Sequence, residues 1–346
     1  MNYKETLTRP DHMDNRNRWM NRLQHVFDGV PDDYNSQYVF TLDGCYGQSQ
    51  TSIYANPEQW VDDCLADLAS KAEQSLTADY FRPLCVECGI YGVHFVDKLL
   101  GAHVYEDHGQ WQADALSTPI GELTYPDLEN NKTWDIAKRA AQAFAQSGVT
   151  VPFFGMPTLS SPLNIAVNLY GEDILVEMMT QPEKAQKDLA VIAKLISDLH
   201  LWYMENIGED RRQQVVAGHR TQPYGYGQIC GCTTQLVSPS VYKELIAPLD
   251  ESILSLYPHG GMIHLCGAHT QHMETFARMK SLRAIQLNDR AAADLPLYRE
   301  ALRPDQIIYL NPCEEMPLDK TRPYTKGGNV IIVDSVMEKR EDTSNA

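Results

Sequence analysis

His264 and Cys266 are the residues whose types and spacing most directly indicate chemistry. They lie two apart at the end of an apolar run, Met262–Leu265, that has the character of a β-strand. Side chains two apart on a strand share a face, so this imidazole and this thiol can reach one point, where together they suit Zn²⁺. Cys313, which follows the apolar run Gln306–Leu310, is the expected third ligand. Three protein ligands leave a fourth position open, as in catalytic zinc sites.

A structural role is the alternative for these residues. In that case His264 is a hydrogen-bonded core histidine and both cysteines are small buried apolar side chains. A bound zinc ion, in contrast, would deprotonate a substrate thiol at neutral pH and make it a nucleophile.

Four other cysteines form two closely spaced pairs, Cys85 with Cys88 and Cys230 with Cys232. Together they could form a four-thiolate zinc site, and a redox pair is a further alternative, but ordinary buried or loop cysteines are the favoured interpretation. Glu87, between the first two, is a candidate general acid or fourth metal ligand.

Further polar residues follow the other expected strands. His219, Arg220, Tyr224 and Tyr226 are candidate substrate-positioning groups, because Arg recognises anionic ligands and Tyr recognises flat ones. A solvated loop is an equally good interpretation of that stretch.

Asn288 and Asp289 follow the apolar run Ala284–Leu287, where Asn288 could contact substrate and Asp289 could transfer protons. Five further histidines have no informative spacing and are expected at the surface or at helix ends: His103, His108, His259, His269 and His272.

Short β-type runs alternate with amphipathic helical segments along the chain. The eight strand candidates are Tyr38–Leu42, Tyr80–Val86, Val149–Phe154, Gln214–Ala217, Met262–Leu265, Ala284–Leu287, Gln306–Leu310 and Val330–Val333. Helix starts are expected at Asn56-Pro57, Gln181-Pro182 and Ser238-Pro239, the last helix being bent or ended by Pro248.

This alternation predicts an α/β fold, a single (β/α)₈ TIM barrel over residues 36–346 with an N-terminal extension over residues 1–35. The competing open doubly wound sheet lacks its GxGxxG signature. In a barrel, function sits at the carboxyl ends of the strands, which is where most of the candidate residues fall.

Composition limits the partners and the compartment. The 46 Asp and Glu against 29 Lys and Arg give a formal net charge of −17, which disfavours nucleic acid and anionic membranes. The N-terminus lacks the apolar stretch of a signal peptide, no run approaches the roughly 20 apolar residues of a membrane span, and the eight cysteines do not form a disulfide framework. We therefore expect a cytoplasmic protein.

Several stretches together match a known pattern. They are Phe154–Gly171, Thr180–Glu183, Ser238–Tyr242 with Pro248, Ile263–Gly267 and Ala284–Asn288. On these stretches the chain resembles, over roughly residues 80–335, the uroporphyrinogen decarboxylase-like superfamily. The resemblance implies the same barrel fold.

Within that superfamily, the His264-x-Cys266-Gly267 motif is similar to the branch that transfers methyl groups between a corrinoid and a zinc-activated thiol. The resemblance implies zinc at His264 and Cys266. It places the third cysteine near the last strand, where this chain has Val333-Asp334, so Cys313 is a substitute one strand earlier. Asn288 replaces the acidic residue of the branch, with Asp289 beside it.

The sequence thus predicts a zinc-dependent methyltransferase that moves a methyl group between a small-molecule donor or acceptor and a corrinoid carried on a partner protein. A homodimer is compatible with the sequence. The alternatives are a decarboxylase or other lyase of the uroporphyrinogen decarboxylase type, or a non-catalytic cofactor-binding barrel. The first is disfavoured because a charge of −17 without an arginine cluster would hold a polyanionic substrate poorly.

Overall fold

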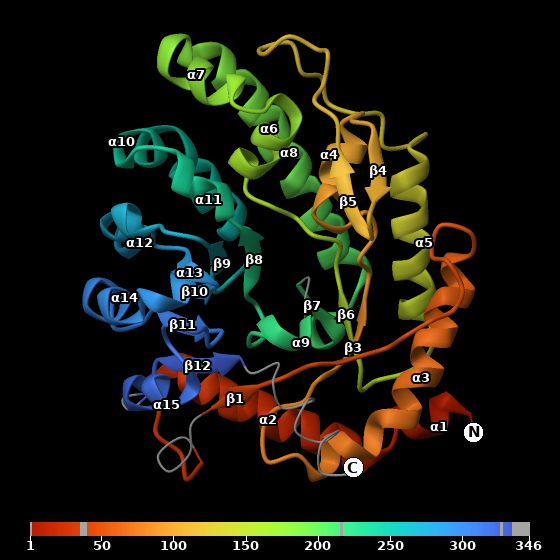
Figure 1. Ribbon diagram of the computed structural model, residues 1–346. Helices are drawn as coiled ribbons and strands as arrows, with labels where there is room; N and C mark the ends of the chain where they lie inside the picture. Colours follow the sequence, from red (N-terminus) through yellow and green to blue (C-terminus); the bar gives the residue numbers. More distant parts are fainter. Residues whose placement is uncertain (1, 35–39, 215–216, 326–327, 334–346) are drawn as a thin grey trace.

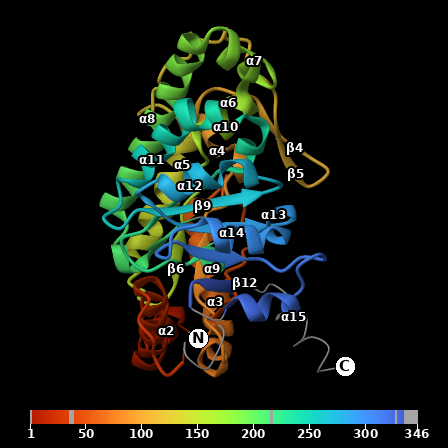
Figure 2. The ribbon, with the colours of Figure 1, turned by 90° about the vertical axis from the view of Figure 1, so that its left-hand side faces the viewer.

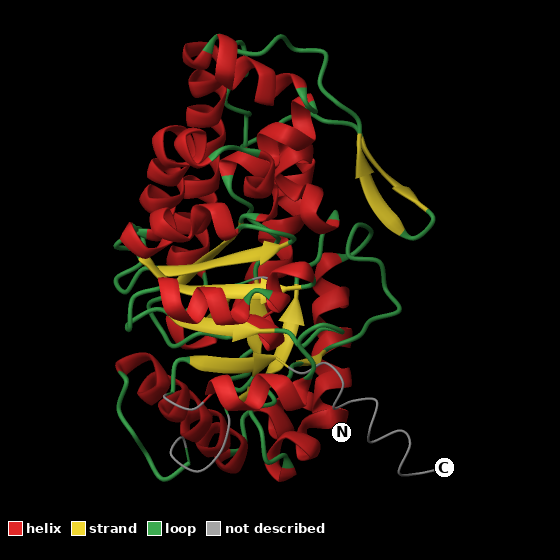
Figure 3. Cartoon of the chain, turned by 60° about the vertical axis from the view of Figure 1, so that its left-hand side comes forward, coloured by secondary structure: helices red, strands yellow, loops and turns green. Residues whose placement is uncertain are grey.

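The computed structural model describes residues 2–34, 40–214, 217–325 and 328–333. Its main feature is a parallel six-stranded sheet (Figures 1 and 3). In spatial order its strands are β1 (Thr41–Leu42), β12 (Val330–Val333), β11 (Ile307–Leu310), β10 (Leu282–Asn288), β9 (Gly261–Cys266) and β8 (Gly227–Cys230).

A second parallel sheet continues from each end of the first. Its strands in order are β2 (Cys45–Tyr46), β3 (Leu84–Glu87), β6 (Phe153–Gly155) and β7 (Arg212–Gln213). Parallel bridges join Leu42 to Phe81 and Ser160 to Cys230, linking the two sheets. No ladder pairs β7 with β8 in the described ranges, so the structure is a mixed α/β fold in which continuous pairing does not form a closed barrel.

Seven of the eight predicted strands overlap observed ones. The exception is Gln214–Ala217: β7 ends at Gln213, residues 215–216 lie outside the described ranges, and helix α9 (Ala217–Arg220) begins at Ala217. The prediction missed β8, whose sequence GQIC has neither an apolar run nor a β-branched majority. It also missed β2 and the antiparallel hairpin of β4 (Val104–Asp107) and β5 (Gln110–Ala113).

The predicted helix starts are confirmed. Asn56 caps α3 (Pro57–Thr77) by accepting a hydrogen bond from the backbone N–H of Gln59, and α8 (Pro182–Asn206) begins at its proline. The third helix begins as α10 (Pro239–Val241), passes through a π-helical turn over Tyr242–Ile246, and continues as α11 (Ala247–Leu254). The π turn accommodates Pro248, which has no N–H to donate, so the helix is not ended there.

The other helices surround the sheets, except that α7 lies beyond them at the top of Figures 1 and 2, against α8 and α6. They are α1 (Tyr3–Leu7), α2 (Pro10–Asp28), α4 (Phe95–Leu99), α5 (Lys132–Gln146), α6 (Pro162–Tyr170), α7 (Asp173–Thr180), α12 (Met273–Arg278), α13 (Arg290–Ala293), α14 (Leu295–Ala301) and α15 (Leu318–Thr321). Short 3₁₀ turns include η3 (Cys232–Leu236) and η5 (Thr270–His272). No helix in the described ranges combines the length and apolarity needed to cross a bilayer.

One face of β9 is apolar near its amino end and polar near its carboxyl end. Met262, near the amino end, lies in a buried cluster with Tyr309 of β11 and with Trp19 and Phe27 of α2, so the N-terminal extension packs on this end of the sheet. Two and four residues after Met262, the same face of β9 carries His264 and Cys266. The polar groups are therefore at the carboxyl ends of the strands.

Candidate metal centre

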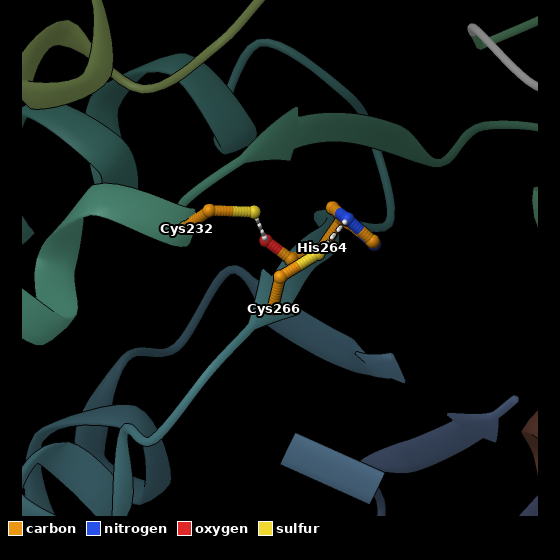
Figure 4. A group of neighbouring side chains, drawn as sticks. All are labelled: Cys232, His264 and Cys266. Carbon is orange, nitrogen blue, oxygen red and sulfur yellow. Dashed lines mark hydrogen bonds between the residues drawn. The ribbon is translucent and has the colours of Figure 1, made fainter. Parts of the chain in front are cut away.

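Cys232, His264 and Cys266 form one compact group of potential metal ligands (Figure 4). Their ligand atoms all lie within 4.8 Å of one another, and the Nε2 atom of His264 is 3.1 Å from the Sγ atom of Cys266. His264 is only 6% exposed, while the two cysteines are half-buried. The group thus has a buried imidazole and two thiols that solvent can reach.

Strand pairing brings these side chains together. In the parallel ladder of β8 and β9, Cys230 lies opposite His264, and Gly231 donates from its backbone N–H to the carbonyl of His264 at 2.8 Å. The chain then turns into η3, and the Cys232 thiol comes within 3.9 Å of that same carbonyl oxygen. Cys232 therefore takes its place because of the turn after β8.

A second layer of amides holds the histidine and one cysteine. The Nδ1 atom of His264 lies 2.8 Å from Oε1 of Gln286, and Gln286 donates from Nε2 to Oδ1 of Asn311 at 2.7 Å. Asn288 donates from Nδ2 to the Cys266 sulfur at 3.5 Å. These residues are at the carboxyl ends of β10 and β11, and Gln286, held by Asn311, fixes the orientation of the His264 ring.

The two thiols differ in acidity. The neighbouring Cys232 thiol is the main cause that lowers the pKa of Cys266, with further contributions from His264 and Asn288. The same neighbour relationship, together with burial, raises the pKa of Cys232. Burial, followed by the positive charge of Arg220, lowers the pKa of His264. A thiolate next to a neutral imidazole is the ligand state that Zn²⁺ requires.

Cys313 is not part of this group. It is half-buried after β11, and its thiol donates to the Glu315 carboxylate at 3.5 Å. The structure brings Cys232 to His264 and Cys266 instead, which differs from the ligand set predicted from the sequence. Asp334, near the position that the resemblance gives for the third ligand, lies outside the described residues.

Asn288 and Asp289 are both brought to the group. Asn288 pairs with Cys266 across β10 and β9, and Asp289 follows with a left-handed backbone conformation at φ 49°. That conformation is strained for a non-glycine residue. Burial, followed by the negative charge of the nearby Cys266 sulfur, raises the pKa of the Asp289 carboxyl.

Arg220 also approaches the group. Its Nη1 atom donates to the Cys230 sulfur at 3.4 Å, and its charge affects His264. Its Nε atom is buried without a hydrogen-bond partner among the described residues. The same is true of both side-chain amide atoms of Gln228, which lies on the same face of β8 as Cys230. Buried donors and acceptors of this kind are expected to meet a ligand or water.

Tyr224 and Tyr226 lie at the opposite end of β8 from the thiols. The Tyr226 ring packs 4.8 Å from Phe27 of α2 and is only 8% exposed, and Tyr224 packs against the same cluster. The sequence placed both tyrosines in a loop after a strand, but β8 begins just after them, so they precede its amino end. Their position does not support contact with a ligand at the thiols.

The first cysteine pair is structural in character. Cys85 in β3 and Cys88 directly after it are fully buried, and burial raises the pKa of both thiols, to about 12 for Cys88. Neither belongs to the metal-ligand group, so the four-thiolate arrangement is not formed. Glu87 ends β3 between them, half-buried, and its charge adds to the effect of burial on Cys85.

Sequence reasoning missed a second polar contact in the interior. The Nε2 atom of His219 lies 3.0 Å from Oδ1 of Asp43, and Tyr46 packs edge-on against the same imidazole. Helix α9 carries His219 between the two groups of strands, where it contacts β3 and β6 (Figure 1). Asp43 and His219 are 176 residues apart, so no spacing could reveal the pair.

Comparison with known proteins gives a structural relative. No family model and no curated protein sequence matches the chain. Among solved structures, a methyltransferase from Methanosarcina mazei is similar with a TM-score of 0.59 at 13% sequence identity, over 91% of this chain and 92% of that one. At this identity the likeness shows a shared fold.

Proposed function

We propose that the protein is a zinc-dependent methyltransferase, which moves a methyl group between a small-molecule substrate and a corrinoid. The observation that carries the proposal is the Cys232–His264–Cys266 group at the carboxyl ends of β8 and β9. The likeness to a methyltransferase supports it, as does the resemblance of the motif His264-x-Cys266 to zinc-dependent enzymes of the uroporphyrinogen decarboxylase-like superfamily.

The proposed architecture is a single (β/α)₈ barrel. Support comes from ten parallel strands in two sheets, joined by the bridges at Leu42 and Ser160. Location supports it too, because the ligand group lies at the carboxyl ends of strands, where barrel enzymes keep their active sites.

The ligand group suits Zn²⁺ in its chemistry. Two thiols and one imidazole are a ligand set found in catalytic zinc sites, and three ligands leave one position for substrate. Gln286 supports the fit: its Oε1 accepts the proton on Nδ1 of His264, which leaves the Nε2 lone pair directed toward the cysteines. Zinc bound here would act as a Lewis acid on a thiol, ether or amine substrate.

The surrounding residues would hold the substrate and its proton. Arg220 would bind and orient substrate through its Nε–H, which has no partner within the described part of the chain, and Asn288 would contact both substrate and the Cys266 sulfur. Asp289, beside that sulfur, would accept the proton that a substrate thiol loses on binding. Glu87, at the end of β3, is a second candidate for this role.

The corrinoid would be carried by a separate protein that docks over the carboxyl ends of the strands. A cytoplasmic location and, as one oligomeric state, a homodimer complete the proposal. Neither nucleic acid nor a membrane is expected as a partner of a chain with net charge −17.

Metal analysis combined with a methyl-transfer assay tests the function. Purified wild-type protein is expected to contain about one zinc ion per chain. With a thiol such as 2-mercaptoethanol as the methyl acceptor, the protein is expected to consume methylcob(III)alamin. The loss of methylcob(III)alamin is measured by visible absorbance. Here the cobalt–carbon bond breaks with both electrons left on cobalt, and the methyl group forms a bond to the substrate sulfur.

Cys266→Ala should lose both zinc and activity, whereas Cys64→Ala, a buried cysteine of α3 outside the ligand group, should keep both. A wild-type protein that binds no zinc would favour a metal-independent lyase. One that binds zinc but transfers no methyl group to or from any thiol, ether or amine would favour a binding protein.

A further inference from the structure

The two cysteines of the ligand group come from different segments of the chain. Cys266 ends β9, whereas Cys232 begins the turn η3 that follows β8. Backbone pairing holds Gly231 to His264, but η3 itself lies beyond the ladder. The separation of the two sulfur atoms therefore depends on whatever fixes η3 relative to the end of β9.

His269 makes that connection. Its imidazole is fully buried, with Nδ1 2.8 Å from the Thr234 hydroxyl in η3 and Nε2 2.5 Å from the carbonyl oxygen of Cys266. A carbonyl oxygen only accepts, so Nε2 carries the proton, and Nδ1 of the neutral ring faces the Thr234 hydroxyl, whose single proton the Gly231 carbonyl oxygen at 2.9 Å also attracts. The ring thus joins the turn that bears Cys232 to the backbone of Cys266.

A second histidine reinforces the same connection. The fully buried His272 lies with Nε2 2.8 Å from the carbonyl oxygen of Thr234, and its ring packs 4.6 Å from Tyr242. Gly267, at φ +85°, allows the loop to pass close to η3, since a Cβ there would lie 2.2 Å from the Gln235 side chain. The loop after β9 is therefore packed along η3.

We propose that His269 is a positioning residue of the metal centre, which sets the distance between Cys232 and Cys266 by linking Thr234 to the Cys266 backbone. The inference rests on the proposed function in one respect, namely that Cys232, His264 and Cys266 bind a metal. His269 itself is not a ligand in this account, because both of its ring nitrogens are occupied by protein groups.

The test measures metal binding and ligand geometry without any activity assay. Zinc affinity is measured by competition with a chromophoric chelator, and Co²⁺ substitution reports thiolate ligands through sulfur-to-cobalt charge-transfer absorbance. His269→Leu is expected to weaken zinc binding by about 10-fold to 100-fold, the usual effect of losing an outer-shell partner, and to lower the charge-transfer intensity. His269→Gln, which keeps one donor and one acceptor, should recover much of both.

Two further variants separate positioning from folding. His200 is equally buried, with Nδ1 2.7 Å from the Tyr257 hydroxyl, and it is not part of this network; His200→Leu should lower stability but leave the zinc affinity and the cobalt spectrum unchanged. If His269→Leu does not fold, Thr234→Val removes only the hydroxyl and should still weaken zinc binding.

The outcomes are distinct. Wild-type protein that binds neither zinc nor cobalt contradicts the proposed function. Wild-type protein that binds zinc, with His269→Leu or Thr234→Val binding it equally well and with the same cobalt spectrum, overturns the role of His269 alone.

Discussion

The Nδ1 atom of His264 lies 2.8 Å from the Oε1 atom of Gln286, and this contact determines which nitrogen of His264 is available to a metal. The amide of Gln286 cannot turn freely, because its Nε2 donates to Asn311 at 2.7 Å. Its oxygen therefore faces the imidazole and requires a proton on Nδ1. The lone pair of Nε2 is left toward Cys266.

Replacement of Gln286 should consequently weaken zinc binding. Gln286→Leu removes the acceptor, leaves the ring free to change tautomer and orientation, and should raise the zinc dissociation constant about 10-fold to 100-fold. Gln228→Leu is the matched control, since this buried glutamine of β8, two strands away from Gln286, has no hydrogen-bond partner for its side chain among the described residues. Equal zinc affinities of the two variants would show that Gln286 does not orient His264.

A pair of cysteine variants distinguishes the observed ligand group from the one expected from the sequence. Cys232→Ala removes a thiol of the group, whereas Cys313→Ala removes one that contacts Glu315 instead. Zinc–peptide sites bind with about 10–16 kcal/mol for four ligands, so loss of one ligand should cost on the order of 3 kcal/mol, about 100-fold in affinity. We expect that loss for Cys232→Ala and near-wild-type zinc content for Cys313→Ala, measured by atomic absorption after dialysis. The reverse result would restore Cys313 as the third ligand.

The contrast between Cys232 and Cys313 shows how far sequence reasoning reached. His264 and Cys266 were predicted because strand alternation alone puts them on one face. To place Cys232 in the group, one has to know where β8 lies. The sequence of β8 contains glycine and glutamine and lacks the apolar run of a buried strand, so the pattern predicts one loop from Arg220 to Cys232. The same error placed Tyr224 and Tyr226 at the wrong end of the strand.

His269 was missed for a related reason. Its spacing matched no pattern, and its role depends on hydrogen bonds to Thr234 and to a backbone carbonyl, which only tertiary structure reveals. Most strands, in contrast, were predictable, since buried parallel strands are continuous apolar runs.

The buried carboxyl of Asp250 should make stability depend on pH. It accepts hydrogen bonds from Ser161 at 2.7 Å and Tyr242 at 3.1 Å, yet burial dominates and raises the pKa of Asp250 from 3.8 to about 7. The folded state therefore binds a proton on the Asp250 carboxyl more tightly than the unfolded state does. The contribution of this proton to the free energy of unfolding is complete below pH 4 and is lost as the pH rises through 7.

Asp250→Asn keeps the shape and does not titrate. The free energy of unfolding of the wild type, relative to this variant, should fall by about 1.4 kcal/mol per pH unit between pH 4 and 7 and then level off. Urea unfolding of both proteins at several pH values measures the difference. Parallel profiles of the two proteins across that range would mean that Asp250 does not titrate there.

Gly44 and Gly218 should tolerate no side chain, because a Cβ built on either would lie 2.3 Å from the Cα of the other. This close approach of two backbones brings His219 of α9 to Asp43 at the end of β1, and neither backbone can give way without breaking that contact. Gly44→Ala should therefore lower the free energy of unfolding by about 1–3 kcal/mol, as overpacking does elsewhere.

Gly89→Ala is the matched control, since Gly89 is exposed with nothing within 4 Å of its added Cβ, and it should change stability by about 0.5 kcal/mol or less. The urea concentrations at the unfolding midpoints of the two variants are compared. Equal midpoints would mean that the backbone around Asp43 and His219 rearranges at little cost, and that the contact between Gly44 and Gly218 does not fix the interior next to Arg220.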